Sequence, residues 1–470
     1  MSQYECSVCG YIYDSQKEKK EWDDLAEDWV CPICESSKKY FGPREGASSS
    51  IDTSVVVGGE DSNAYLSEWE RSHDDSEEYM KDIHVMAETG FSIIEPMRTR
   101  KPVIAWDDIL IQGAQLATLP LNHDVAVATK TVIGPHAKHP LVIETPIIIS
   151  HMSFGALSRE IKTALAQGSA AVKTAICSGE GGILPDEYEK AYAYIFEYVP
   201  NQYSVTDENF KKVDAVEIKF GQSAKPGMGG HLPGSKVTAE IAEIRGFEEG
   251  KDIHSPAHFG DIKNKDDLKK KVTWLREKTG GKPIGIKMAC GHLEDDLDVA
   301  LFAEPDFITI DGRAGATAAS PKYVKASTSI PTIFAVYRAR KHFEKRGVKG
   351  ISLVVTGGLR ISPDFAKALA LGADVVAIAT SALMACGCQQ YRICDTGKCP
   401  LGITTQNPEL RKRLKVDKSA ECLANYLRVS TEELKSFARL TGNNDVHKLS
   451  IADLCTTNSE LSQHTEITHV

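Results

Sequence analysis

The regular alternation of short apolar runs with helical segments, beginning near residue 96, constrains the fold of this chain more than any other feature. Residues 266–279 and 362–371 show the mixed charged and apolar pattern of helices, and the second stretch begins at a Ser-Pro pair. Such alternation indicates an α/β protein with a parallel sheet. About eight units fit the span, which predicts a closed (β/α)8 TIM barrel. The predicted strands are 147–149, 174–177, 215–218, 253–255, 284–288, 307–310, 353–356 and 375–379.

The length and local composition predict more than one domain. A chain of 470 residues exceeds the usual size of a single hydrophobic core. Residues 1–42 contain two CxxC pairs and are expected to form a small domain. Residues 43–95 are rich in Gly, Ser, Asp and Glu for most of their length, which is typical of a linker and lead-in segment. The barrel domain is expected over 96–430, followed by a polar, amphipathic C-terminal tail over 431–470.

The charge balance argues against a nucleic-acid-binding protein. Lys and Arg number 55 against 65 Asp and Glu, a formal net charge of -10, whereas a nucleic-acid binder shows a basic stripe. The longest apolar run, 375–386, is interrupted by Thr380 and Ser381, and the first ten residues lack the pattern of a signal peptide. We therefore expect a cytoplasmic protein with no membrane or nucleic-acid partner, and a homo-oligomer.

Eight of the twelve cysteines fall in two clusters, a distribution more typical of metal ligands than of disulfides in a cytosolic protein. The first cluster is Cys6, Cys9, Cys31 and Cys34. Four thiolates from two CxxC pairs suit either zinc or a single iron, and cysteine spacing does not choose between them. The aromatic residues around these pairs make the first 42 residues resemble rubredoxin, which implies a one-electron iron centre. A structural zinc ribbon is the alternative.

Glycine-rich loops follow several predicted strands, where a TIM barrel carries its chemistry. Small residues let the backbone approach a flat ring closely, and a TGGL turn at 356–359 is a typical phosphate-binding position. Lys219 and Lys287, at the ends of the predicted third and fifth strands, are placed to stabilise negative charge on a reduced flavin. Together these loops suggest an FMN site.

The order of the motifs resembles the FMN-binding domain of glutamate synthase, in its stand-alone archaeal and bacterial form, from about residue 147 to 406. The motifs are MSFGALS, SGEGG, IKFGQSAKPGMGGHLPGSKV, TGGL and CPLGITTQ. The resemblance implies FMN at the barrel mouth and reductive amination of 2-oxoglutarate, through 2-iminoglutarate, to L-glutamate. The implied cofactor contacts are Met152, Ser153, Ser178, Lys219, Lys287, Gly357, Gly358 and Thr380. The implied catalytic residues are Glu180, Gln222, Lys225 and His231.

The second cysteine cluster resembles the iron-sulfur motif of the same family. Cys388, Cys394 and Cys399 lie in one loop after the last predicted strand, which implies a 3Fe-4S cluster. Cys386 is the candidate for a fourth thiolate, in which case a 4Fe-4S cluster would form. A cluster in this loop would lie near the flavin, so electrons could pass directly between the two.

The sequence departs from the family in ways that concern ammonia, electrons and substrate. An amidotransferase domain is not found in this chain, so ammonia is expected from solution or from a separate glutaminase subunit. Because no GxGxxG nicotinamide fingerprint follows a strand, a protein electron donor such as ferredoxin is expected. The family pattern KPGEGGQ reads KPGMGGH over 225–231, while Arg313 offers a guanidinium for a substrate carboxylate.

Two other functions fit the same motifs. One is an FMN oxidoreductase of the same fold that acts on a different amino, oxo or hydroxy acid. The other is a redox relay protein with no catalytic turnover, whose flavin only passes electrons. Glu180, Lys225 and His231, in loops that a relay would not need, favour an enzyme.

Overall fold

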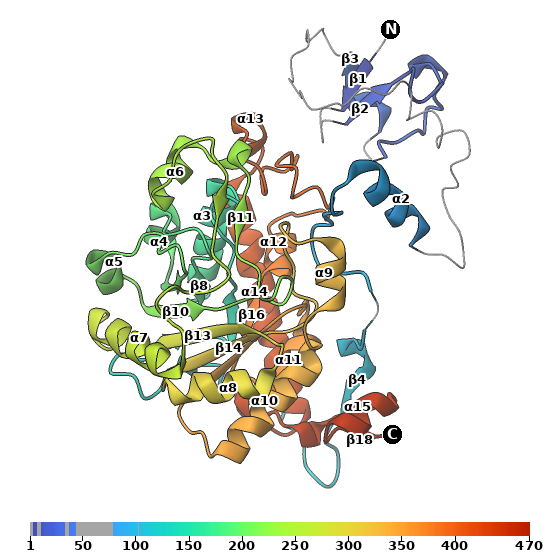
Figure 1. The fold of residues 1–470 in the computed structure, drawn as a ribbon. Coiled ribbons are helices and arrows are strands. Elements are labelled where there is room, and N and C mark those ends of the chain that lie inside the picture. The colour runs from blue at the N-terminus through green and yellow to red at the C-terminus, as the bar shows by residue number, and fades with distance from the viewer. Residues whose placement is uncertain (1–2, 7–10, 33–36, 44–78, 102) are drawn as a thin grey trace. The chain divides into compact units, whose positions relative to one another are not determined.

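The computed structural model describes residues 3–6, 11–32, 37–43, 79–101 and 103–470 (Figure 1). The chain divides into two compact units, Met1–Ile94 and Glu95–Val470. In the described parts, no helix is both long enough and apolar enough to cross a membrane.

The first unit contains a small antiparallel sheet in the order β2-β1-β3, with a cluster of aromatic rings beside it. Tyr13 and Trp22 are buried, and the ring of Tyr4 stacks on that of Trp22 at a centroid distance of 4.3 Å. Cys6 and Cys31 are buried, whereas Cys9 and Cys34 lie outside the described residues. The elements of this unit are β1 (Gln3–Cys6), β2 (Ile12–Asp14), η1 (Trp22–Asp24), η2 (Lys38–Tyr40), β3 (Phe41–Pro43) and α2 (Met80–Thr89).

The second unit is built on a closed parallel barrel of eight strands, so the predicted fold is confirmed. Consecutive strands are hydrogen-bonded neighbours, and the last pairs with the first to close the ring, with β16 beside β7. In chain order the barrel strands are β7 (Ile147–Ile149), β8 (Ala175–Cys177), β9 (Ala193–Tyr198), β10 (Ala215–Lys219), β13 (Ile284–Ala289), β14 (Phe307–Asp311), β15 (Ser352–Thr356) and β16 (Val375–Ile378).

One predicted barrel strand was wrong. Residues 253–255 lie outside the barrel, because β12 (Ile253–His254) pairs only with β11 (His231–Leu232) in a two-stranded antiparallel hairpin. The true third strand is β9, all six residues of which are buried. Lys219 therefore ends the fourth barrel strand, directly beside Lys287 on the fifth.

Helices surround the barrel strands (Figure 1). The predicted helices at 266–279 and 362–371 correspond to α7 and α11, and the Asn264 side chain caps α7 by accepting from the backbone N–H groups of Asp266 and Asp267. The helices are α3 (Arg159–Ala170), α4 (Pro185–Lys190), α5 (Asp207–Lys212), α6 (Ala239–Arg245), α7 (Lys265–Lys278), α8 (Leu293–Phe302), α9 (Lys322–Ser327), α10 (Thr332–Arg346), α11 (Ser362–Ala370), α12 (Thr380–Ala385), α13 (Pro408–Arg411), α14 (Val416–Leu440) and α15 (Ser459–His464).

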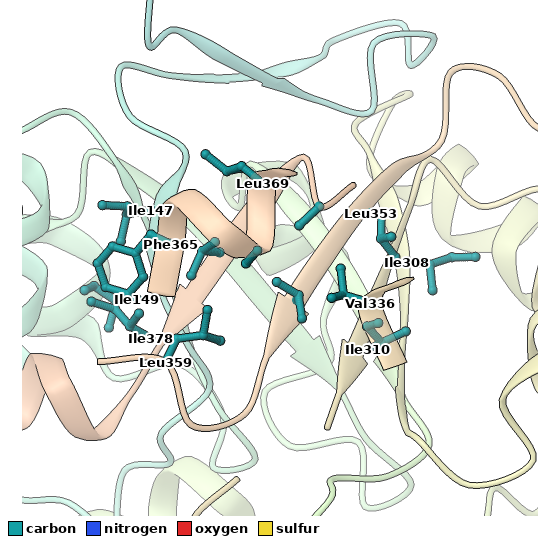
Figure 2. Close-up of a cluster of buried hydrophobic side chains, with 14 of the residues drawn as sticks. Ile147, Ile149, Ile308, Ile310, Val336, Leu353, Leu359, Phe365, Leu369 and Ile378 are labelled. Carbon is teal, nitrogen blue, oxygen red and sulfur yellow. The ribbon is translucent and has the colours of Figure 1, made fainter. Parts of the chain in front are cut away.

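The core has two layers because successive side chains of a strand point to opposite faces. Ile147 and Ile149 belong to the layer between strands and helices, where they lie near Phe365 of α11 (Figure 2). Ile148, between them in sequence, belongs to a separate cluster with Val354 and other strand residues. Near the carboxyl ends of the strands, charged side chains such as Lys219 and Lys287 take the place of apolar ones. They belong to the site described below.

Short additional elements complete the second unit. Residues 454–456 form β17, which pairs with β4 and β18, so part of the predicted tail is tied to a segment that precedes the barrel. The predicted boundary at 430/431 falls inside α14, which packs against α3. The remaining elements are η3 (Trp106–Asp108), β4 (Ile109–Ile111), β5 (Thr131–Ile133), β6 (Leu141–Ile143), η4 (Gly234–Lys236), η5 (Val446–Lys448), η6 (Ile451–Asp453), β17 (Leu454–Thr456) and β18 (Thr468–His469).

Candidate active site at the barrel mouth

Two adjoining pockets open at the carboxyl ends of the barrel strands, and Gln222 lines both. We call the first the lysine pocket; its lining includes Glu180, Lys219, Gln222, Lys225, Gly229, Gly230 and His258. We call the second the glycine pocket; its lining includes His151, Gln222, Lys287, Asp311, Gly357, Gly358, Arg360 and Thr380. The shared glutamine makes the two pockets neighbours.

The glycine pocket is shaped by backbone that only glycine can form. Gly357 has a φ of +113°, and a Cβ there would lie 2.3 Å from the carbonyl oxygen of Gly312. Gly358 has a φ of +87°, and its Cβ would lie 2.5 Å from that of Ala314. L-residues rarely adopt such angles, so this turn is specified by its two glycines. Its backbone is thereby available for close approach by a ligand.

The same pocket carries a partly buried arginine, Arg360, suited to an anion. Burial, together with the nearby charge of Arg98, lowers the pKa of Arg360 to about 10. Asp364 accepts hydrogen bonds from the backbone N–H groups of Arg360 and Ile361, at 2.7 and 3.3 Å, and so orders the start of this segment. A phosphate beside Arg360 would compensate the two neighbouring positive charges, and a guanidinium matches phosphate geometry.

A chain of buried opposite charges lies between the two pockets. Lys219 donates to Glu180 at 2.6 Å, and its Nζ lies 3.9 Å from Glu197. Lys287 lies 3.7 Å from the same Glu197 oxygen. Burial alone would raise the pKa of Glu180, but the ammonium groups of Lys219 and Lys225 lower it to about 2. Glu180 is therefore an anion at neutral pH, which keeps Lys219 positively charged.

Glu197 holds an unusual position in this chain of charges. It is 2% exposed, and neither of its carboxylate oxygens accepts a hydrogen bond within the described structure. Burial of a carboxylate without hydrogen bonds is costly. The two lysines at 3.7 and 3.9 Å supply its electrostatic compensation. This geometry keeps both ammonium groups at the barrel mouth, where an anionic ligand would find them.

A second buried carboxylate, Glu217, is held by polar side chains. His151 contacts Glu217 through Nε2, and Thr309 donates to the other Glu217 oxygen. Burial would raise the pKa of Glu217, but His151 and the nearby charge of Lys287 lower it. Ser223 donates to Asp311 at 2.7 Å. His151 and Asp311, which line the glycine pocket, are thus both held by buried polar partners.

Lys225 differs from the other lysines of the site in its proton affinity. Burial, followed by repulsion from Lys219, lowers the pKa of Lys225 to about 8. Its Nζ donates to the carbonyl oxygen of Gly229 at 3.0 Å, which holds the ammonium within the lysine pocket. A lysine with this pKa exchanges protons near neutral pH, as a general acid requires.

A buried ion pair holds together two of the glycine-rich loops. Lys162 of α3 donates to the carbonyl oxygens of Met152 and Ser178, at 2.5 and 2.9 Å, and contacts Glu187 at 2.6 Å. Tyr194 also donates to Glu187 at 2.8 Å. Lys162 therefore fixes two loops at once from below the barrel mouth.

Replacement of Lys162 with methionine is expected to destabilise the protein by about 3–5 kcal/mol, because Glu187 would remain buried without its cation. A lowered thermal midpoint in differential scanning calorimetry checks this. The double variant K162M/E187L should recover much of the loss, since it removes both charges. A single variant as stable as the parent would contradict the assigned role of the pair.

The thiols of the second cysteine cluster converge in the loop after α12. Burial raises the pKa of the Cys394 thiol to about 11, and the neighbouring sulfurs of Cys388 and Cys399 add to this rise. Gln390 donates to the Cys388 sulfur at 3.3 Å. Cys386 lies at the end of α12, where its thiol interacts most strongly with that of Cys422 on α14. The three cysteines of the predicted motif thus form one group that lies within the second unit.

Comparison with known families identifies both units. Residues 105–444 match the model of a conserved region in glutamate synthase, and residues 3–41 match rubredoxin. The chain belongs to the glutamate synthase family.

Relatives from bacteria and archaea match most of the chain. A glutamate synthase large subunit-like protein of Rhizobium meliloti (strain 1021) is 36% identical over 83% of this chain and 92% of the relative. An archaeal glutamate synthase (NADPH) of Methanocaldococcus jannaschii is 40% identical over 68% of this chain and 62% of the relative. Among solved structures, the recombinant flavin-binding domain of baker's yeast flavocytochrome b2 is 16% identical with a TM-score of 0.46, covering 77% of this chain and 80% of that one.

Most residues predicted from the glutamate synthase motifs lie around the two pockets. Glu180, Lys219, Gln222 and Lys225 line the lysine pocket. Lys287, Gly357, Gly358 and Thr380 line the glycine pocket with Gln222. The loops of Met152, Ser153 and Ser178 are in close contact, since a Cβ on Gly179 would lie 2.5 Å from the backbone of Met152 and Ser153. Their direct contacts to a cofactor remain predictions.

Two predicted residues lie differently. His231 lines neither pocket and is hydrogen-bonded to Asp252 on the outside of the hairpin, so its catalytic role remains a prediction without support from this geometry. Arg313 does not point to a free carboxylate position, because its guanidinium donates to the backbone carbonyls of Thr328 and Ala326 at 3.1 and 2.6 Å. The interpretation of Arg313 as a substrate anchor is therefore not supported.

Glu197 and Arg360 are site residues that the sequence did not predict. Glu197 had a detectable signal, a single charge inside the apolar run 193–198. A charged residue within a fully buried strand requires a partner, which itself points to a polar site. Arg360 directly follows the TGGL turn, and a single arginine after a turn does not by itself predict a binding site.

Proposed function

We propose that this member of the glutamate synthase family catalyses the reductive amination of 2-oxoglutarate with ammonia, through 2-iminoglutarate, to L-glutamate. The observation that carries the proposal is the lysine pocket, in which Lys225, with a pKa of about 8, lies near the Glu180–Lys219 ion pair. This pocket adjoins, through Gln222, a glycine pocket lined by the partly buried Arg360. The names of the relatives support the same reaction.

The glycine pocket fits FMN. Gly357 and Gly358 offer a backbone cradle that a Cβ would fill, and Arg360 offers a cation for the phosphate. Lys287, which lines this pocket, would bring positive charge to the flavin, where it favours the reduced ring, and Lys219 is its direct neighbour on the adjoining strand. Bound FMN would supply a hydride to the imine carbon of the substrate.

The residues of the lysine pocket account for binding and proton transfer. The ammonium groups of Lys219 and Lys225 suit a dicarboxylic oxo acid, since charge-assisted hydrogen bonds to carboxylates are strong. Glu180 holds Lys219 in position and keeps it charged. Lys225 would donate a proton to the oxygen that leaves as water during imine formation, and its pKa of about 8 keeps that proton available at neutral pH.

Electrons would enter through the two metal centres. A mononuclear iron would bind Cys6 and Cys31 together with Cys9 and Cys34, the last two being outside the described residues. Cys388, Cys394 and Cys399 would hold a three-iron cluster, with Cys386 as the fourth ligand if four irons bind. We propose a protein donor such as ferredoxin as the source of electrons. Ammonia would come from solution or from a separate glutaminase subunit.

Anaerobic purification followed by a single turnover tests this function. The holoenzyme should contain one FMN and about four irons per chain, one mononuclear and three in the cluster. The reduced enzyme mixed with 2-oxoglutarate and ammonium should reoxidise its flavin and form one glutamate for every two electrons that the flavin and the iron centres release. FMN and iron without glutamate would contradict the substrate and favour a different oxo acid or a relay. A protein that binds no flavin would overturn the proposal.

Cys6→Ala is expected to remove the mononuclear iron and leave the cluster and the FMN in place, because the rubredoxin and barrel units are separate. Glutamate formation driven by a protein donor should then fall at least about tenfold, whereas turnover with dithionite, a small reductant that can reach the flavin directly, should stay within twofold. Iron analysis and the two assays check this prediction. Equal loss with both reductants would show that electrons do not enter at this centre.

A further inference from the structure

A cluster of three potential metal ligands lies on the β11–β12 hairpin, outside both pockets. His231 and His254 are directly paired in the antiparallel register, so their side chains lie on the same face. Their rings stack at a centroid distance of 4.5 Å with an interplanar angle of 5°. Asp252 stands two residues before His254. One ligand atom from each of the three residues falls within 4.8 Å of the others.

One carboxylate oxygen is the centre of this arrangement. The Oδ2 atom of Asp252 lies 2.9 Å from Nε2 of His231 and 3.9 Å from Nε2 of His254. Ligand atoms around a tetrahedral zinc ion at bond lengths of about 2.0–2.2 Å stand roughly 3.3–3.6 Å apart. The observed separations are on either side of that range. Small side-chain rotations would therefore bring the two nitrogens and the oxygen to bonding distance of one ion.

The ligand positions are preorganised by the backbone. The other oxygen of Asp252, Oδ1, accepts the backbone N–H of Gly234 at 2.7 Å, which fixes the carboxylate. The backbone N–H of Ser255 donates to Gly230 at 2.8 Å, which closes the hairpin beside His231 and His254. A hydrogen bond to each ligating group from outside the metal shell is the usual support of a metal site.

The cluster is accessible, and its chemistry selects the ion. The three side chains are 43%, 54% and 69% exposed for His231, Asp252 and His254, so an ion can reach them from solvent. Two imidazoles and one carboxylate suit zinc and similar transition-metal ions rather than calcium or magnesium, which prefer oxygen. Three protein ligands leave a fourth position for water.

We propose that His231, Asp252 and His254 form a binding site for a zinc-class divalent cation on this hairpin. The position of the site connects it to the lysine pocket, because Gly230, next to His231, lines that pocket. On the other strand, Ser255, next to His254, hydrogen-bonds to Glu180. The ion would therefore cross-link the two strands at the rim of the pocket.

Zinc binding to the anaerobic holoenzyme, with its iron sites filled, tests the proposal. Equilibrium dialysis against Zn²⁺ should show one more bound ion per chain in the parent protein than in H254A or D252N, and the affinity at that site should fall at least about tenfold in each variant. H139A, a change of an exposed histidine elsewhere, should bind as the parent does. All three changed side chains are largely exposed, so folding should be retained.

The zinc K-edge absorption spectrum provides a second readout that does not depend on activity. The difference between the spectra of the parent and H254A should show nitrogen and oxygen ligands with the signature of imidazole. Equal zinc binding by the parent, H254A and D252N would overturn the proposal. So would a spectrum with sulfur ligands only, because it would place the ion at cysteines instead.

Discussion

Lys225→Met is expected to lower kcat for glutamate formation by about 10²- to 10⁴-fold, the range typical of a lost general acid. The variant should keep its FMN and iron, because Lys225 lines the lysine pocket and not the glycine pocket. Its Nζ donates a hydrogen bond to the carbonyl oxygen of Gly229, which positions the proton that the variant would lack. Steady-state rates with reduced donor, 2-oxoglutarate and a constant concentration of free ammonia check the prediction.

The pH dependence follows from the pKa of about 8 for Lys225. A general acid must carry its proton, and the ammonium form predominates below that pKa. The rate of the parent enzyme should therefore fall as the pH rises through about 8, and the variant should lack this decline. A decline of the same size and midpoint in the variant would show that another group donates the proton.

Two further variants separate proton donation from simple binding of a carboxylate. Lys225→Arg keeps the positive charge but does not release its proton near neutral pH. If Lys225 donates a proton, K225R should have a low kcat with a KM near that of the parent. If Lys225 only binds, kcat should remain high. Lys412→Met, a change of an exposed lysine on the surface, should stay within twofold of the parent in both constants.

The barrel was predictable from sequence because its strands are short, mostly apolar and separated by helices. Seven of the eight predicted strands coincide with barrel strands. The one wrong strand reflects the short length of β12 and the charged residue, Glu197, inside β9. Residues 253–255 contain a single apolar residue, Ile253, and form only a two-residue hairpin strand, whereas β9 was missed although all six of its residues are buried.

The glycines and lysines of the candidate site that follow strands in the sequence were predictable. Site residues whose partners are distant in the sequence were harder to predict. The turn at Gly357 and the lysine at 287 each stand at the end of a predicted strand. Glu197, by contrast, gains its importance from two lysines on other strands, a relation that needs the closed barrel. Arg313 shows the opposite error, because two of its three guanidinium nitrogens donate to backbone carbonyls and not to a substrate.

Gly357→Ala is expected to weaken FMN binding by roughly thirty- to several hundred-fold, equivalent to about 2–3.5 kcal/mol. At a φ of +113°, an alanine would be strained, and its Cβ would lie 2.3 Å from the Gly312 carbonyl oxygen and 2.9 Å from Thr332 Oγ1. Thr332 also donates to the carbonyl oxygens of Gly357 and Arg313, at 2.7 and 3.0 Å. The turn must therefore move as a unit, which displaces the proposed phosphate cradle. Flavin fluorescence titration of the apoprotein checks this.

Gly347→Ala separates loss of the cradle from the general cost of a strained backbone. Gly347 has a φ of +66° at the end of α10, and a Cβ there would meet nothing within 4 Å. Its replacement should cost about 1 kcal/mol of stability and leave FMN affinity unchanged. If G357A and G347A bound FMN equally well, the phosphate would not lie on this turn. If only G357A lost FMN while its thermal midpoint without flavin matched that of G347A, the loss would come from the cradle itself.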